Sequence, residues 1–98
     1  MKIEKRTAQY YEIKSLDGAY GLCGTFHNEE QALVEINRSY ESAKEKGYDD
    51  RNDRWIIVCV ERTVERDENG YFLSETTKRF AVADVEFSEY EECFVFVY

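Results

Sequence analysis

The sequence predicts one α+β domain, residues 1–98, in which a single amphipathic helix packs on a largely antiparallel sheet of four or five strands in the order β-β-α-β-β-β. Three observations support this fold class. The chain has 98 residues, which is enough for one hydrophobic core and too few for two. Its hydrophobic content of 43% is too high for an acidic disordered chain. One segment has helical hydrophobic periodicity, and the other apolar runs are rich in β-formers and separated by turn signals.

The first two strands are predicted to form a hairpin. Residues 8–16 include the β-formers Tyr10, Tyr11 and Ile13 and run into Asp17-Gly18, a dipeptide typical of a type I′ turn. Residues 19–26 then return as the second strand, which its glycines shorten or bulge.

The helix follows at Asn28, a preferred N-cap residue. Acidic residues in the first turn and Gln31 at the capping-box position strengthen this start, and Gly47 is a natural stop. Five apolar residues of the helix fall on one face, namely Ala32, Leu33, Ile36, Tyr40 and Ala43.

Residues 55–60 are the most apolar run and are predicted to form a central strand. The same pattern continues to Asn69-Gly70, a second type I′ signal, which would make the numbers of opposed residues add up to 139. The predicted pairs are Glu61 with Lys78, Cys59 with Phe80, and Ile57 with Val82.

Residues 93–98 are predicted to form a terminal strand. This strand either lies inside the sheet or pairs with the same strand of a second copy, so a homodimer through the carboxy-terminal strand stays open.

The charge balance limits the classes of partner. The chain carries 21 Asp or Glu against 13 Lys or Arg, a net charge of −8. Such a domain repels phosphate groups, so we expect neither direct nucleic-acid binding nor adhesion to anionic membranes. A basic protein or nucleoprotein complex is the expected partner.

The compartment predicted from the sequence is the cytoplasm. The amino terminus lacks the apolar stretch of a signal peptide, and no segment approaches the roughly 18 apolar residues of a membrane span. Three widely spaced cysteines, each in an apolar run, are expected to be reduced and buried.

We expect no enzyme activity, no metal and no cofactor. His27 is best explained as the residue before the helix cap, and Cys23, four positions earlier, is not placed to act with it as a nucleophile. Asp49, Asp50 and Asp53 lack the alternating ligands, the glycine and the final glutamate of a calcium loop.

Acidic residues are concentrated near the carboxy terminus. Residues 84–98 carry five acids and no base. These carboxylates and the tyrosine among them would suit a basic partner. The alternative is that the acidic residues serve only to keep the apolar terminal strand from pairing edge to edge with another chain. The candidate protein-binding residues are Asp84, Glu86, Glu89, Tyr90, Glu91 and Glu92, with Asp49, Asp50 and Asp53 as secondary candidates.

In its size, its charge of −8 and its run Glu86-Phe87-Ser88-Glu89-Tyr90-Glu91-Glu92, the chain resembles small acidic inhibitors that phages and mobile elements use against host defence. These include anti-CRISPR proteins and DNA mimics. The resemblance is one of composition over the whole chain and transfers no residue roles. It implies a stoichiometric, non-enzymatic inhibitor of a basic nucleic-acid-handling host complex.

The alternative function is a small-ligand-binding or regulatory accessory domain. Aromatic rings on the sheet would then stack on a nucleotide or metabolite, although aromatic residues at strand spacing are more often part of a core. The ligand would lie on the concave face of the sheet, near Tyr10, Tyr11, Tyr20 and Trp55.

Overall fold

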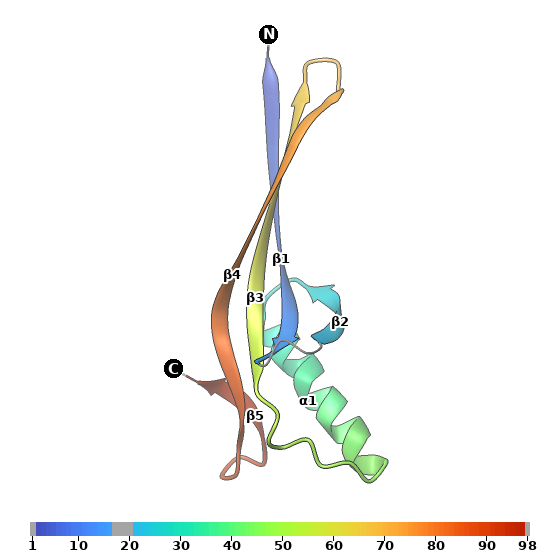
Figure 1. The fold of residues 1–98 in the computed structure, drawn as a ribbon, viewed down its shortest axis with the longest axis vertical. Coiled ribbons are helices and arrows are strands. Elements are labelled where there is room, and N and C mark those ends of the chain that lie inside the picture. The colour runs from blue at the N-terminus through green and yellow to red at the C-terminus, as the bar shows by residue number, and fades with distance from the viewer. Residues whose placement is uncertain (1, 17–20, 98) are drawn as a thin grey trace.

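The computed structural model describes residues 2–16 and 21–97. It has the predicted α+β class and the predicted order of elements along the chain (Figure 1). The predicted turn at Asp17-Gly18 lies outside the described residues. The elements are β1 (Ile3–Ser15), β2 (Gly21–Phe26), α1 (Glu29–Glu45), β3 (Trp55–Asp67), β4 (Phe72–Ser88) and β5 (Cys93–Val97).

The described strands form one five-stranded sheet in the order β2-β1-β3-β4-β5, and each neighbouring pair is antiparallel. This spatial order differs from the chain order because β1 lies between β2 and β3. The apolar strand β3 is central, as predicted. β5 lies at one edge of the sheet and β2 at the other (Figure 1).

The sheet is much longer than the helix that covers it. α1 has 17 residues and β4 also has 17. A strand rises about 3.3 Å per residue and a helix about 1.5 Å, so the strand is more than twice as long. The molecule therefore measures 58 × 28 × 21 Å, and β1, β3 and β4 extend beyond the helix as a three-stranded arm, residues 2–10 and 60–80 (Figure 1).

The main hydrophobic cluster lies where α1 covers the sheet, and Val58 and Val60 are also buried on the opposite face of β3. Ile36 and Tyr40 of the helix pack against Ile57, Val85 and Phe94 of the strands, and all five side chains are buried. Burial of each such side chain is worth roughly 1.5–3 kcal/mol.

On the sheet face that α1 covers, the part that extends beyond the helix is polar. Side chains of β1 and β3 bind one another there, so the arm needs no helix to cover it. The pairs are Thr7 with Thr63 at 2.9 Å, Gln9 with Glu61 at 2.8 Å, and Lys5 with Glu65 at 3.2 Å.

The helix begins and ends as predicted. The Asn28 side chain accepts the backbone N–H of Gln31 at 2.8 Å. Gln31 accepts the N–H of His27 at 3.2 Å, one residue before the position that a standard capping box uses. At the other end, the N–H of Gly47 donates to the Lys44 carbonyl.

The β3–β4 hairpin keeps most of the predicted register but not the predicted turn. Glu61 lies opposite Lys78 and Cys59 opposite Phe80, as expected. The prediction of a type I′ turn is wrong. Such a turn needs a positive φ at both Asn69 and Gly70, and only Gly70 has one, +85°. The N–H of Gly70 donates to the Asp67 carbonyl, which makes a type I turn closed by a left-handed glycine.

Two other strand predictions need correction. Ile57 lies opposite Ala83 and not Val82, because a β-bulge shifts the register between Ile57 and Val58. β1 starts at Ile3 rather than at residue 8, because its polar first half pairs with β3, as in Ile3 with Asp67. β2 does show the expected irregularity, which lies opposite the Tyr11 to Ile13 segment of β1.

Strand β5 is held by the helix as well as by β4. The Asn37 side chain of α1 donates to the Phe94 carbonyl at 3.0 Å and accepts the Phe94 N–H at 2.7 Å. This amide imitates the hydrogen bonds of a neighbouring strand, so the outer edge of β5 is partly closed within the chain.

Candidate protein-interaction surface

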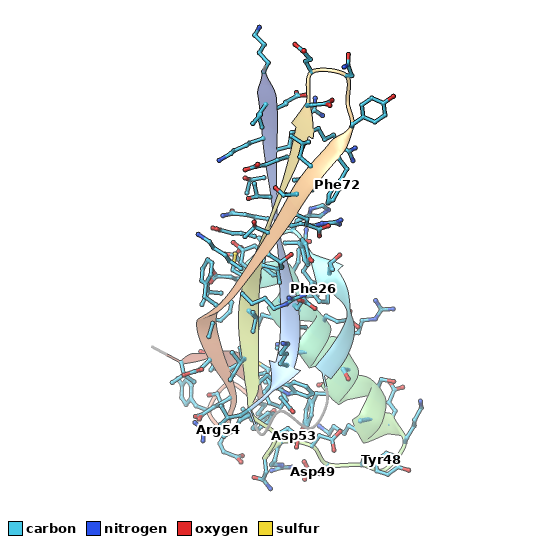
Figure 2. All side chains as sticks on the ribbon, turned by 45° about the horizontal axis from the view of Figure 1, so that its top comes forward. Phe26, Tyr48, Asp49, Asp53, Arg54 and Phe72 are labelled. Atoms are coloured by element: carbon cyan, nitrogen blue, oxygen red, sulfur yellow. The ribbon has the colours of Figure 1, made fainter. Side chains whose placement is uncertain are left out.

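The two predicted acidic segments meet at the end of the molecule opposite the arm. Arg51 joins them, because its Nε is 2.9 Å from Asp49 Oδ1 and its Nη1 is 3.7 Å from Glu89 Oε2. Asp49 and Asp53 lie together at this end in Figure 2. We call this surface the acidic end. Its residues are Asp49, Asp50, Asp53, Glu86, Glu89, Tyr90, Glu91 and Glu92, together with Arg51 and Arg54.

The hydrophobic core positions Arg51. Its guanidinium carbon lies 5.7 Å from the centre of the Phe87 ring, a cation–π distance. Phe87 in turn packs against Tyr40 and Phe94, with ring centres 5.2 and 5.5 Å away. The arginine that links the acidic segments is therefore seated on a fixed aromatic cluster.

The β4–β5 turn presents the densest group of acids. The Ser88 carbonyl accepts the N–H of Glu92 at 2.7 Å, and its hydroxyl accepts the N–H of Glu91 at 3.2 Å. Glu92 has a φ of +58°, a conformation that favours glycine or asparagine. Tyr90 is 96% exposed, so this turn holds an aromatic ring in solvent between carboxylates.

Two of the candidates, Asp84 and the acidic-end residue Glu86, lie on β4. Glu86 pairs with Arg54 at 2.6 Å. Asp84 is opposite Ile56 and two residues before Glu86, so both acids are on the sheet face turned away from α1. Within the part of the chain that the structure describes, no salt bridge involves Asp84, Glu91 or Glu92. Their charges are therefore not offset by a direct ion pair with a described residue.

Arg51 also keeps the neighbouring carboxylate ionised. Its hydrogen bonds to Asp49 lower the pKa of that carboxyl below the ordinary value. Reciprocally, hydrogen bonding and attraction to Asp49 raise the pKa of Arg51, with a smaller contribution from Glu89. Both groups are fully charged near neutral pH.

The net charge is unevenly distributed over the length of the molecule. The arm, residues 2–10 and 60–80, carries seven bases and six acids, a net charge of +1. The rest of the chain therefore has a net charge of −9. The negative field belongs to the helix-bearing part of the molecule, which includes the acidic end.

The three described aromatic residues expected near a ligand-binding face do not share one surface. Trp55 is buried in the core. Tyr10 and Tyr11 are consecutive residues of β1, so their side chains point to opposite faces of the sheet. Tyr20 lies outside the described residues.

The remaining chemical candidates are reported for the described residues only. His27 is exposed and uses its backbone N–H to cap the helix start. Cys59 is a buried free thiol and Cys93 a half-buried one, whereas the side chain of Cys23 is not described. No three His, Cys, Asp or Glu side chains among residues 2–16 and 21–97 are grouped as a metal site would require.

Comparisons with known proteins give no relatives. No protein-family model, curated protein or solved structure matches the chain. Of the described helical segments, none combines the length and the apolar character needed to cross a bilayer.

Several important residues were not predicted from the sequence. Arg51 and Arg54 were not candidates, although each lies within two residues of a predicted acid. The arm also has an open groove of about 730 Å³ on the face turned away from α1. Alternation along β3 would have placed Arg62 and Arg66 on one face of this arm. The groove residues are Glu4, Arg6, Thr7, Ala8, Arg62, Val64 and Arg66.

Proposed function

We propose that the protein is a non-enzymatic, cytoplasmic binding module that uses its acidic end to bind and inhibit a basic nucleic-acid-handling complex. The observation that carries this proposal is the link through Arg51, which joins Asp49 to Glu89 and makes two acidic segments one surface. In this role the carboxylates occupy a basic groove in place of phosphates, and no cofactor is needed.

The net charge, an exposed aromatic side chain and one backbone conformation together support a protein partner. The helix-bearing part of the chain has a net charge of −9, which accelerates association with a basic surface and repels nucleic acid. Tyr90, which is 96% exposed, supplies the kind of aromatic anchor that dominates many interfaces. Glu92 occupies a backbone conformation that glycine would adopt more easily, as expected where a side chain is kept for binding rather than for stability.

The compositional resemblance to anti-CRISPR and DNA-mimic inhibitors favours a nucleic-acid-handling target over other basic proteins. Inhibition would be stoichiometric, because the protein occupies the site and performs no reaction on it. Binding should weaken as salt is raised, since exposed charges are screened.

The test compares two variants with equal changes in charge. The first replaces acids of the β4–β5 turn, E89Q/E91Q/E92Q, and is combined with Y90A. The matched control, E4Q/E65Q/E68Q, removes three acids of the arm. Each immobilised protein is incubated with nuclease-treated lysate at low and raised salt, and the captured complex is assayed for nucleic-acid binding with and without the protein.

We expect the wild type and the arm control to capture a nucleic-acid-handling complex and to block its substrate binding in a 1:1 ratio. The turn variant should bind at least about 30-fold more weakly, the loss expected when anchor residues worth about 2 kcal/mol are removed. Equal affinity of the two variants, or capture of a complex whose nucleic-acid binding is unchanged, would refute the proposal.

A further inference from the structure

Strand β4 has a long edge that nothing in the described structure covers. β5 pairs with β4 only from Asp84 to Ser88. Before that point all residues from Phe72 to Val82 are exposed, and within the described chain no strand pairs with their outer side. The edge carries large apolar side chains, namely Phe72 at 56% exposure, Leu73 at 43%, Phe80 at 44% and Val82 at 37%. A long exposed edge of this composition is a template for another strand.

The other free edges are less suited to pairing. The first half of β1 is also unpaired on its outer side, because β2 pairs only with residues from Tyr11 to Lys14. In that half Glu4, Lys5 and Arg6 are consecutive charges, and of its described residues Ile3 is the one exposed large hydrophobic side chain. The edge of β5 is engaged at Phe94 by the Asn37 side chain. β2, the other edge strand, has only six residues. Among the described strands, β4 therefore offers the free edge with the most exposed large apolar side chains, and we take it as the place where the sheet continues.

We propose that a second copy of this chain pairs with the β4 edge, antiparallel, with Thr77 on a two-fold axis perpendicular to the sheet. With such an axis, the same face of the sheet points in the same direction in both copies. Two residues paired across the interface must therefore have their side chains on the same face. Because faces alternate along a strand, only registers centred on a residue of β4 satisfy this condition.

The charges of β4 select one of these registers. Centring on Thr77 places Glu75 opposite Arg79 of the second copy, and the two-fold axis makes this pair twice. Centring on Glu75, Lys78 or Arg79 would put a like charge directly opposite its own symmetry mate. Centring on Thr76 gives no pair of opposite charges.

The intramolecular ion pairs extend this complementarity. Glu75 already pairs with Arg62, and Arg79 lies 3.4 Å from Glu12. Across the interface the charges would alternate in sign, from Arg62 and Glu75 of one copy to Arg79 and Glu12 of the other. Such an alternating row lets each charge face opposite charges on both sides.

The length of the free edge fits the same register. The regular part of the free edge lies between the two register shifts of the β3–β4 pairing, from Ser74 to Ala81, and Thr77 is close to its middle. In a pairing centred on Thr77, Ser74 lies opposite Phe80, and the paired span ends before β5 begins to cover β4 at Asp84. The exposed Phe80 of each copy is thereby brought beside the Phe72–Leu73 end of the other copy. The result is a sheet of six strands through the two arms, with about ten new backbone hydrogen bonds.

The pairing also determines how the acidic ends are presented. Since β4 runs in opposite directions in the two copies, the acidic ends lie at opposite ends of the dimer. A dimer of this form is bivalent, although neither the pairing nor the function of the acidic end depends on the other.

The test measures oligomeric state and register. Sedimentation velocity from about 1 µM to about 0.5 mM should show a monomer–dimer equilibrium, within the range expected for a standard interface. T77C should form a disulfide-linked dimer under mild oxidation, because the two thiols meet at the axis. T76C is the matched control, since its two copies would be diagonal neighbours about 7–8 Å apart, beyond disulfide reach.

A charge reversal provides the second test. R79E places two glutamates against each other at both symmetric sites and should weaken the dimer at least about tenfold. R66E, on β3 of the same arm, is the control and should leave dimerisation unchanged. A monomer at all concentrations, equal cross-linking of T77C and T76C, or a dimer that R79E does not affect would each overturn the proposal.

Discussion

The side chain of Asn37 offers a sharp test of how the terminal strand is held. Its amide forms two hydrogen bonds with the backbone of Phe94, at 2.7 and 3.0 Å, and this contact is partly buried. N37A removes both bonds and leaves an N–H and a C=O of β5 without partners. We therefore expect the substitution to loosen β5 and the turn before it.

The size of the effect follows from the bonds that are lost. Two hydrogen bonds at about 1 kcal/mol each, with about 1 kcal/mol for the unsatisfied backbone groups, give a loss of about 3 kcal/mol. Alanine is a better helix former than asparagine by about 0.6 kcal/mol, which reduces the expected loss to about 2 kcal/mol. A domain of this size is stable by roughly 5–15 kcal/mol, so the change is well within measurable range.

Urea unfolding followed by circular dichroism measures the change in the free energy of global unfolding. Hydrogen exchange of the Phe94 amide measures the change in the local opening of β5. S42A, at an exposed position of the same helix, is the matched control and should be neutral or slightly stabilising. N37D keeps the acceptor for the Phe94 N–H and loses the donor. Its free energy of unfolding should therefore lie between that of N37A and that of the wild type. If N37A costs less than about 0.5 kcal/mol and leaves Phe94 exchange unchanged, the amide does not hold the strand.

Three further predictions concern the acidic end and the arm. E92G should raise the free energy of unfolding by about 0.5–1 kcal/mol, because glycine relieves the strain at φ +58°, and it should weaken partner binding; a loss of stability in urea unfolding would contradict this. The lowered pKa of Asp49 means that its pairing with Arg51 favours the folded state above the pKa of the unfolded chain, and this contribution disappears as the pH falls through the lowered value. In R51A, carboxyl carbon shifts should report an Asp49 pKa moved up towards the ordinary value, and an unchanged titration would exclude Arg51 as the cause. Backbone amides of the arm in β1 and β4 should exchange with solvent faster than those of β3 in the core; uniform protection over the whole length of the sheet would show that the arm opens only with the rest of the domain.

The sequence predicted the features that depend on neighbouring residues. The Asn28 cap needs only residues three positions away, and the register of Glu61 with Lys78 follows from a short hairpin. Residues 55–60 lie in the central strand of the sheet, as expected for the most apolar run of the chain. The type I′ turn failed because the Asp67 side chain accepts the N–H groups of Asn69 and Tyr71, which favours a loop longer by one residue.

The features that were missed depend on contacts between distant segments. The arginine between Asp49 and Glu89 can be recognised only when the 49–54 loop and the β4–β5 turn are known to be adjacent. The polar first half of β1 has no strand signal of its own, and it is a strand because β3 lies beside it. Only the part of the arm formed by β3 and β4 could have been inferred from lengths, because a strand is longer than a helix with the same number of residues.

The two proposed contacts differ in physical origin, and salt separates them. Binding at the acidic end rests on exposed charges, whose interactions are screened beyond about 8 Å at physiological ionic strength. Pairing at the β4 edge rests mainly on backbone hydrogen bonds and apolar side chains, with Glu75 and Arg79 as its complementary charges, so its dependence on salt should be weaker. Raising the salt should therefore release a basic partner and leave most of the dimer. If the dimer dissociated as steeply as the partner, the two copies would instead be joined through opposite charges, with the acidic end of one against the arm of the other.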